Sequence, residues 1–158
     1  MNLLIDEERR EQALLVLDDG TAFAGFSCGA TGEAFGEIVY DTDAFGYQAA
    51  ACAPENEGKL VVFTYPQIGN HGVNGLGACP AAAAAGVVVH DMVYTPSSWA
   101  SEGSYPEFLA ERGVVAIEDV DTRALTAAIR DAGRPVRAAI STTDLDPASL
   151  AARLAEGE

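Results

Sequence analysis

Short apolar runs alternate with glycine, proline, asparagine and aspartate along the chain, and this pattern predicts a mixture of strands and helices. Runs rich in β-branched and aromatic residues, bounded by turn residues, are typical of strands. Strands are expected at residues 14–17, 21–27, 37–42, 60–65, 87–89, 114–117 and 136–140. The first two are expected to form a hairpin about an Asp-Gly turn.

Three helices are expected in the second half of the chain, each preceded by a residue that can cap it. The caps are Ser104, Asp121 and Asp146, and proline follows Asp146 at the first helical position. The apolar face of the middle helix consists of Leu125, Ala128 and Ile129. A hairpin combined with strand–helix–strand units indicates an α/β fold.

The strand at residues 60–65 runs directly into a loop of unusual composition. Pro66 cannot donate to a ladder, and Gly69, Asn70 and Gly72 tolerate positive φ angles that most residues avoid. Binding groups are often placed on such loops at the end of a strand. The segment is therefore a candidate functional loop.

Length and charge restrict the class of protein. A chain of 158 residues with 49% hydrophobic residues fits one globular domain, and no apolar run is long enough to cross a membrane. The net charge of −15 would repel phosphate backbones, which excludes nucleic acid as an expected partner. Acidity of this kind serves solubility or selects a basic partner surface. Residues 1–12 are charged and lack the pattern of a secretion signal, so a cytoplasmic location is expected.

The residues that could carry chemistry are few and scattered. Cys28, Cys52 and Cys79 are an odd number at wide spacing, which disfavours a disulfide framework or a zinc site. Cys79 precedes a proline and follows no strand, so it is not expected to be a nucleophile. His90 ends a strand and fits a structural imidazole. Turn and bulge positions, without a phosphate-loop motif, are expected for Gly25, Gly29, Gly32 and Gly36.

Several strings in order along the chain point to one family. They are LLVLDDGT, GATGEAFGEIVYDT, GYQ at residues 46–48, VVFTYPQIGNHGVN, PSSW at residues 96–99 and DVDTRALTAAIR. From about residue 13 to residue 140 the chain resembles the N-terminal domain of the small subunit of glutamine-dependent carbamoyl-phosphate synthase. The order and spacing of the strings, more than any single one, carry the resemblance.

The resemblance implies a fold and a role. The fold would be a three-layer β/β/α domain of the swivelling type with mixed sheets, spanning residues 1–158 as a single domain. Residues 1–12 would be a charged extension, and residues 142–158 a C-terminal helix or a linker. The role would be that of a scaffold that docks the glutaminase to the large subunit, which makes carbamoyl phosphate from glutamine-derived ammonia, bicarbonate and ATP. The product would feed pyrimidine or arginine biosynthesis.

No catalytic residue, metal site or cofactor is expected in the chain itself, since the family's glutaminase chemistry belongs to another domain. The partner interface is expected to involve the candidate loop and the junction that begins the helix after Asp121. Its residues would be Thr64, Tyr65, Pro66, Gly69, Asn70, Gly72, Asn74, Asp121, Thr122 and Arg123.

One position departs from the family in a way that affects substrate contact. Glu55 stands where the family has a serine that reaches toward glutamine in the neighbouring domain, and a carboxylate does not suit the carboxylate of glutamine. Phe45 and Ala49 also differ from the usual residues around the Gly-Tyr-Gln string. An alternative interpretation is a diverged, free-standing binding or regulatory module with the same fold and no enzymatic partner.

Overall fold

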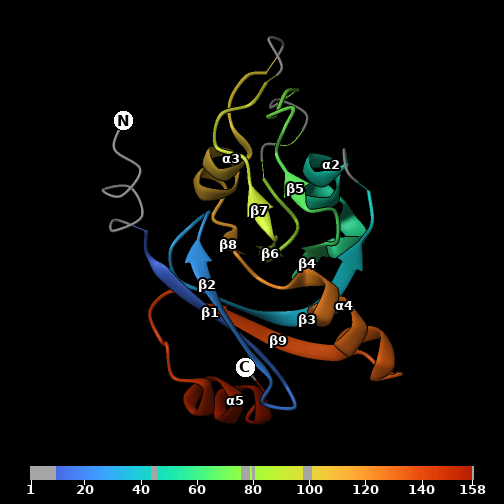
Figure 1. Cartoon of the computed structure of the whole chain (residues 1–158), viewed down its shortest axis with the longest axis vertical. Coiled ribbons are helices and arrows are strands. Elements are labelled where there is room, and N and C mark those ends of the chain that lie inside the picture. Colours follow the sequence, from blue (N-terminus) through green and yellow to red (C-terminus); the bar gives the residue numbers. More distant parts are fainter. Residues whose placement is uncertain (1–9, 44–45, 76–78, 80, 98–100, 158) are drawn as a thin grey trace.

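The computed structural model describes residues 10–43, 46–75, 79, 81–97 and 101–157 (Figure 1). The strands are β1 (Gln12–Leu17), β2 (Ala22–Ser27), β3 (Glu33–Asp41), β4 (Leu60–Phe63), β5 (Gln67–Ile68), β6 (Gly86–Val88), β7 (Asp91–Met92), β8 (Val115–Glu118) and β9 (Val136–Ser141). The helices are α2 (Tyr47–Cys52), α3 (Tyr105–Glu111), α4 (Thr122–Asp131) and α5 (Pro147–Ala155), with a 3-10 turn at Pro54–Asn56.

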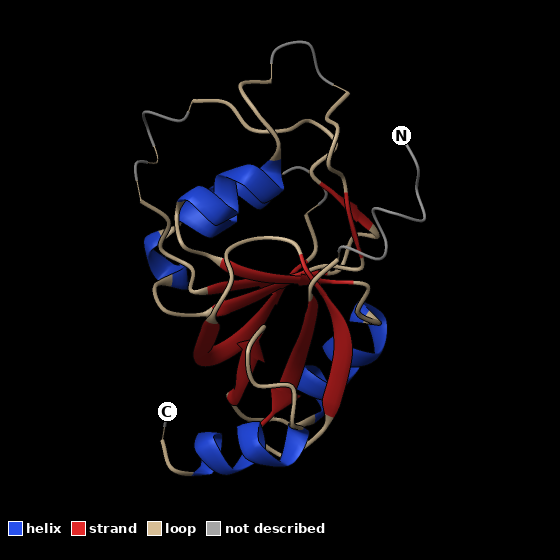
Figure 2. Cartoon of the chain, turned by 90° about the vertical axis from the view of Figure 1, so that its left-hand side faces the viewer, coloured by secondary structure: helices blue, strands red, loops and turns tan. Residues whose placement is uncertain are grey.

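Seven of these strands close into a barrel in the order β1-β2-β8-β6-β4-β3-β9. Strands β3, β4, β6 and β8 are mutually parallel, whereas β1, β2 and β9 join through antiparallel pairs. Closure leaves no exposed edge within this sheet. Strands β5 and β7 form a separate parallel pair above the barrel (Figures 1 and 2).

Alternating side chains of the central strands pack into two different apolar clusters. In β4, Leu60 and Val62 belong to the cluster that also contains Ile117 and Ile140, whereas Val61 and Phe63 belong to the cluster under α2 and α3. The strand is therefore buried on both faces, which explains its continuous apolar run. On β1, Leu14 and Val16 face a third cluster, which α5 completes with Leu150 and Leu154.

Helix α5 is also held to the barrel by charge. Arg153 donates to both carboxylate oxygens of Glu33 at 2.8 and 2.7 Å, and its guanidinium lies 4.8 Å from the centre of the Phe35 ring. The hydrogen bonds from Arg153 hold the pKa of the Glu33 carboxyl below its ordinary value. Residues 147–155 thus form a helix packed on the barrel.

The α/β prediction is confirmed, with most strands within a few residues of their expected bounds.

The prediction that four glycines occupy turns and bulges is wrong at two positions, because Gly25 and Gly36 lie inside strands. A Cβ atom on Gly25 would come within 2.2 Å of the Glu118 carbonyl oxygen, and one on Gly36 within 2.2 Å of the Gly58 carbonyl oxygen. These glycines permit close approach of neighbouring backbones, and β3 consequently begins before the predicted start.

Part of the expected N-terminal extension joins the barrel. Residues 1–9 lie outside the described residues, but Ser27 N–H donates to the Glu11 carbonyl at 2.7 Å and β1 begins at Gln12. Arg10 pairs with Glu118 at 3.2 Å and its guanidinium lies 4.0 Å from the centre of the Phe26 ring. Residues 10–12 therefore contact or belong to the barrel.

The prediction against a disulfide is wrong for two of the three cysteines. Cys52 and Cys79 are bonded, with Cα atoms 6.1 Å apart and a sequence separation of 27. Wide spacing gave no sign of this pair because α2 and the segment before β6 meet only in the fold. Cys28 is a free buried thiol, and burial raises its pKa well above the ordinary value.

Reducing the disulfide is expected to lower the free energy of unfolding by about 3.5 kcal/mol, the loop-closure contribution for a loop of this length. Thermal and denaturant unfolding with and without a phosphine reductant would measure the loss. The Cys52→Ser/Cys79→Ser double variant is the control, since reductant should not change its midpoint. An unchanged midpoint of the parent protein on verified reduction would contradict the expectation.

Candidate functional site

The parallel strands bring the residues that follow them to one edge of the barrel. Thr64 follows β4, His90 lies just beyond β6, and Asp119 follows β8. Helix α4 begins beside them. In α/β proteins the carboxyl ends of parallel strands are the usual place for binding groups.

A hollow of about 570 Å³ lies at this edge. Its lining residues are Thr64, Pro66, His90, Asp119, Asp121, Thr122 and Arg123. It unites two segments of the expected interface that are more than fifty positions apart in sequence. His90 and Asp119 were not among the expected interface residues, and His90 is exposed, which does not fit the prediction of a structural imidazole.

The turn at Asp119 has an unusual backbone. Its φ angle is 66°, the only positive value at a non-glycine position in the described part of the chain. Aspartate tolerates this region better than most residues, and its N–H donates to the His90 carbonyl at 2.9 Å. The turn joins the ends of β6 and β8 and places the Asp119 side chain at the rim of the hollow.

Helix α4 begins as the sequence predicts. The Asp121 carboxylate accepts a hydrogen bond from the Ala124 N–H at 3.0 Å, the expected capping geometry. Thr122 is buried and Arg123 is exposed. Asp121 therefore has a structural role, while Arg123 is accessible to a partner.

Beyond the hollow, the last part of the loop, residues 71–74, lies against α2. The Tyr47 hydroxyl donates to the Gly72 carbonyl at 2.7 Å and accepts from the His71 N–H at 3.1 Å. The Gln48 side chain donates to the Asn74 carbonyl at 2.6 Å and accepts from the Asn74 N–H at 3.1 Å. The Gly-Tyr-Gln string therefore has a structural role, since Tyr47 and Gln48 hold the loop in place. The sequence alone did not indicate this role.

The loop backbone needs its glycines. Gly72 has a φ angle of 63°, and a Cβ atom there would lie 2.5 Å from the Gly103 carbonyl oxygen. Gly69 has a φ angle of 103° and is buried. Of the other expected interface residues in this segment, Tyr65 is 45% exposed, Asn70 is half-buried and Asn74 is exposed.

A buried carboxylate, that of Glu118, lies at the end of β8. Glu118 is 5% exposed, accepts a hydrogen bond from the Tyr94 hydroxyl and pairs with Arg10. Burial raises the pKa of the Glu118 carboxyl, although Tyr94 and Arg10 oppose that shift. Burial also raises the pKa of the Tyr94 phenol, with Glu118 adding to the effect.

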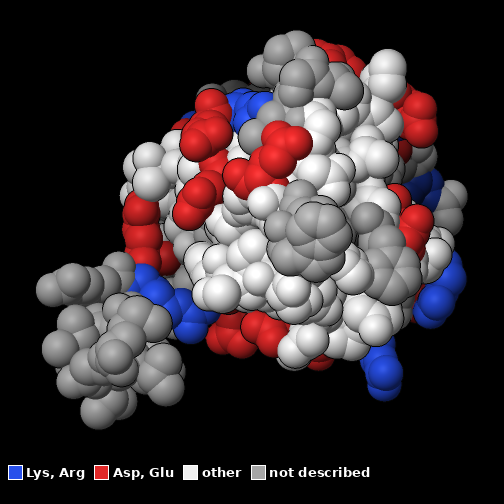
Figure 3. All heavy atoms as spheres, turned by 90° about the horizontal axis from the view of Figure 1, so that it is seen from above, with Lys and Arg blue, Asp and Glu red and all other residues white. Residues whose placement is uncertain are grey.

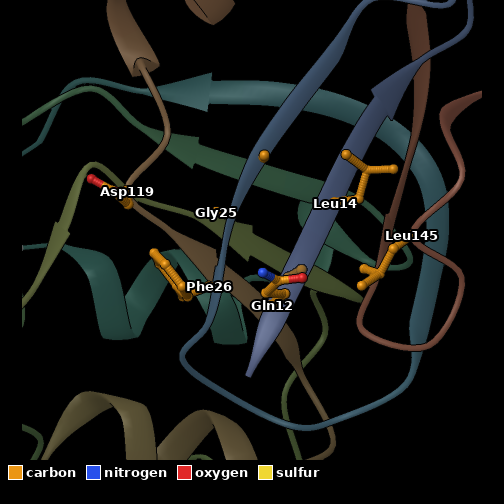
Figure 4. A pocket seen from close by; sticks show the side chains of 8 residues that line it. Gln12, Leu14, Gly25, Phe26, Asp119 and Leu145 are labelled. Atoms are coloured by element: carbon orange, nitrogen blue, oxygen red, sulfur yellow. The ribbon is translucent and has the colours of Figure 1, made fainter. Parts of the chain in front are cut away.

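A second hollow, of about 310 Å³, lies over β1 and β2 (Figure 4). Asp119 lines it together with Gln12, Phe26 and Leu145. Its remaining lining is mostly apolar or backbone, so it offers few groups that could orient a small ligand.

Glu55 is separate from both hollows. It lies exposed on the 3-10 turn after α2. Phe45, one of the departures from the family, and Trp99, of the string PSSW, lie outside the described residues.

The candidate thiol and the possible metal ligands can be compared with the structure. The Cys79 sulfur is bonded to Cys52, so it is not a thiolate. Among the described residues no cluster of three or more histidine, cysteine or carboxylate side chains could hold a metal ion. No helix in the described ranges has the length and apolarity of a membrane span.

Comparisons with known proteins agree with the sequence resemblance. The family model "Carbamoyl-phosphate synthase small chain, CPSase domain" matches residues 15–140. The carbamoyl phosphate synthase small chain of Thermotoga maritima is 48% identical over 147 residues, covering 92% of this chain and 37% of the relative. The Aquifex aeolicus small chain is 40% identical over 148 residues, covering 93% of this chain and 40% of the relative. The chain thus spans well under half of these relatives.

Among solved structures, an aminopeptidase from Aneurinibacillus sp. strain AM-1 aligns with a TM-score of 0.45 and 19% identity, covering 84% of this chain and 30% of that one. A likeness of this size carries no argument about function. The match to the family model is informative, because it covers most of the chain and agrees with the strings from LLVLDDGT to DVDTRALTAAIR. The chain therefore belongs to the carbamoyl-phosphate synthase small-chain family, of which it represents the N-terminal CPSase domain.

Proposed function

We propose that this domain is the scaffold that docks a glutaminase domain to the large subunit of carbamoyl-phosphate synthase. One observation carries the proposal: the hollow at the carboxyl edge gathers Thr64 and Pro66 with Asp121, Thr122 and Arg123. Ammonia released from glutamine, bicarbonate and ATP would react on the partners, and the chain would supply contact surface only. The product would enter pyrimidine or arginine biosynthesis.

The docking surface in this proposal extends from the hollow across the loop. A specific interface needs at least about 1,000 Å² in total, more than the hollow alone provides. Exposed Tyr65 and Asn74 enlarge it. Because Tyr47 and Gln48 already hold the loop, little conformational freedom would be lost on binding.

Two finer features belong to the same proposal. The three-layer β/β/α arrangement would correspond to the two walls of the closed sheet with helices outside them. A cytoplasmic location would suit the enzyme, although the Cys52–Cys79 disulfide is uncommon in a reducing compartment.

Glu55 would contribute nothing favourable to glutamine binding. At about 4 Å and an effective dielectric near 20, two carboxylates repel by roughly 4 kcal/mol. Its exposed position allows the side chain to point to solvent or to a basic group of the partner. A glutaminase paired with this chain would therefore bind glutamine without help from this turn.

Docking is expected to weaken when the proposed surface is altered. Arg123→Ala and Asn70→Ala should each reduce affinity for the large subunit at least about fivefold, or about 1 kcal/mol, the loss that separates contributing contacts from near-neutral ones. Binding would be measured by titration with the purified large subunit, and Lys59→Ala, at the other end of β4, is the control. If both variants bind as tightly as the parent chain, this surface is not the interface.

Replacing Glu55 by serine is expected to increase glutamine affinity in the complex with the glutaminase, by up to about a thousandfold if the full repulsion applies. Isothermal titration with glutamine would measure it. Glu57→Ser removes the same charge from an exposed neighbouring position and controls for general electrostatics. A large fall in affinity for Glu55→Ser would show instead that the carboxylate has a binding role.

A further inference from the structure

A groove of about 340 Å³ runs beside α4, next to the hollow at the carboxyl edge. Its lining residues are Tyr40, Thr42, Thr64, Arg123, Thr126, Ala127 and Arg130. We call it the α4 groove. It shares Thr64 and Arg123 with the hollow, but the two differ in chemistry, because Asp119 and Asp121 line the hollow and no carboxylate lines the groove.

The polar lining of the α4 groove is rich in hydrogen-bond donors. Arg123 and Arg130 are seven positions apart on one helix, so both project from the same face about two turns apart. The lining also includes the hydroxyl residues Tyr40, Thr42, Thr64 and Thr126, of which Thr64 already donates to the Asp41 carbonyl at 3.3 Å. Guanidinium and hydroxyl donors together suit an anionic oxygen group.

Both arginines are accessible. Arg123 makes no ion pair with any described residue. Arg130 pairs only with Asp131, at 3.4 Å, and these side chains are 63% and 72% exposed, so the pair contributes little. The arginine charges are therefore left for another partner.

One donor inside the groove has no partner. The Thr126 hydroxyl oxygen is buried and makes no hydrogen bond with the described residues. Buried polar atoms are nearly always satisfied, and an exception calls for an explanation. A bound acceptor in the groove would satisfy it once the side chains that cover the hydroxyl move aside.

The α4 groove is an exception to the negative charge of the molecule, so an acidic ligand would favour the groove over the rest of the surface. The net charge is −15, and Figure 3 shows many red carboxylates on the face seen from above, with the blue basic side chains towards its periphery. An acidic ligand would be repelled by most of the surface. Two accessible arginines without a lining carboxylate are a local exception.

We propose that the α4 groove receives a carboxylate side chain from an acidic segment of a protein partner. Its open form and the exposed ring of Tyr40, 42% accessible, suit a peptide segment better than a small free anion. The groove adjoins the proposed docking surface. The inference does not depend on docking to the synthase large subunit, since it concerns the chemistry of the groove alone.

A peptide titration tests the assignment. The probes are a twelve-residue peptide with four glutamates, the same peptide with glutamines, and inorganic phosphate, each followed by amide chemical shifts of the full chain. The glutamate peptide is expected to shift Thr42, Thr64 and the amides of residues 123–130, and the glutamine peptide is not. Binding of both peptides alike, or equal shifts with phosphate at the same concentration, would overturn the proposal.

Single substitutions test the roles of the two arginine charges and of the Thr126 hydroxyl in binding the peptide. Arg123→Gln and Arg130→Gln should each weaken binding of the glutamate peptide about threefold, and the double variant about tenfold. Lys59→Gln, which removes the same charge at the far end of β4, should change it less than about twofold. Thr126→Val should weaken binding about threefold without lowering the melting temperature, because it removes an unsatisfied hydroxyl. Equal losses with Lys59→Gln, or no loss with the arginine variants, would overturn the proposal.

Discussion

The contact between Tyr47 and Tyr105 is the interaction on which the candidate surface depends. Their rings meet edge to face with centroids 4.6 Å apart, and the Tyr105 hydroxyl donates to the Tyr47 carbonyl at 2.8 Å. Burial raises the pKa of both phenols, so the hydroxyls stay protonated and able to donate. Tyr47 is thereby fixed where its own hydroxyl can hold residues 71 and 72. Such a buried pair contributes beyond its apolar area.

The second constraint is the direction of the strands. Because β4, β6 and β8 are parallel, Thr64, His90 and Asp119 meet at one edge although long segments separate them in sequence. The barrel supplies a rigid support and the segments above it supply the exposed groups. The proposed docking surface and the α4 groove are neighbours for the same reason, since α4 starts at the edge where β8 ends.

Features set by local chemistry could be predicted from the sequence. Ser104, Asp121 and Asp146 cap the helices that follow them, because their side chains satisfy the first free N–H groups. Helix α2 was missed because it is short and has no capping side chain.

Features set by tertiary contact could not be predicted in this way. The Cys52–Cys79 bond, the positive φ angle of Asp119 and the glycines inside strands all depend on elements that meet only in the fold. The two interface segments were expected from family strings, but the groove beside Arg130 required the packing of α4 against the end of β3. Residue patterns therefore led to the proposed surface, and the fold defines the chemistry of the groove beside it.

The Tyr47 hydroxyl is expected to shape the loop, whereas the barrel should be independent of it. Amide hydrogen exchange in Tyr47→Phe tests this most directly, because the ring contact with Tyr105 is kept and only the hydroxyl is lost. We expect His71, Gly72 and Asn74 to exchange about 10-fold to 100-fold faster, the equivalent of roughly 1–3 kcal/mol for buried hydrogen bonds, with the amides of β4 and β6 unchanged. Unchanged loop amides, or equal acceleration in the barrel strands, would contradict it.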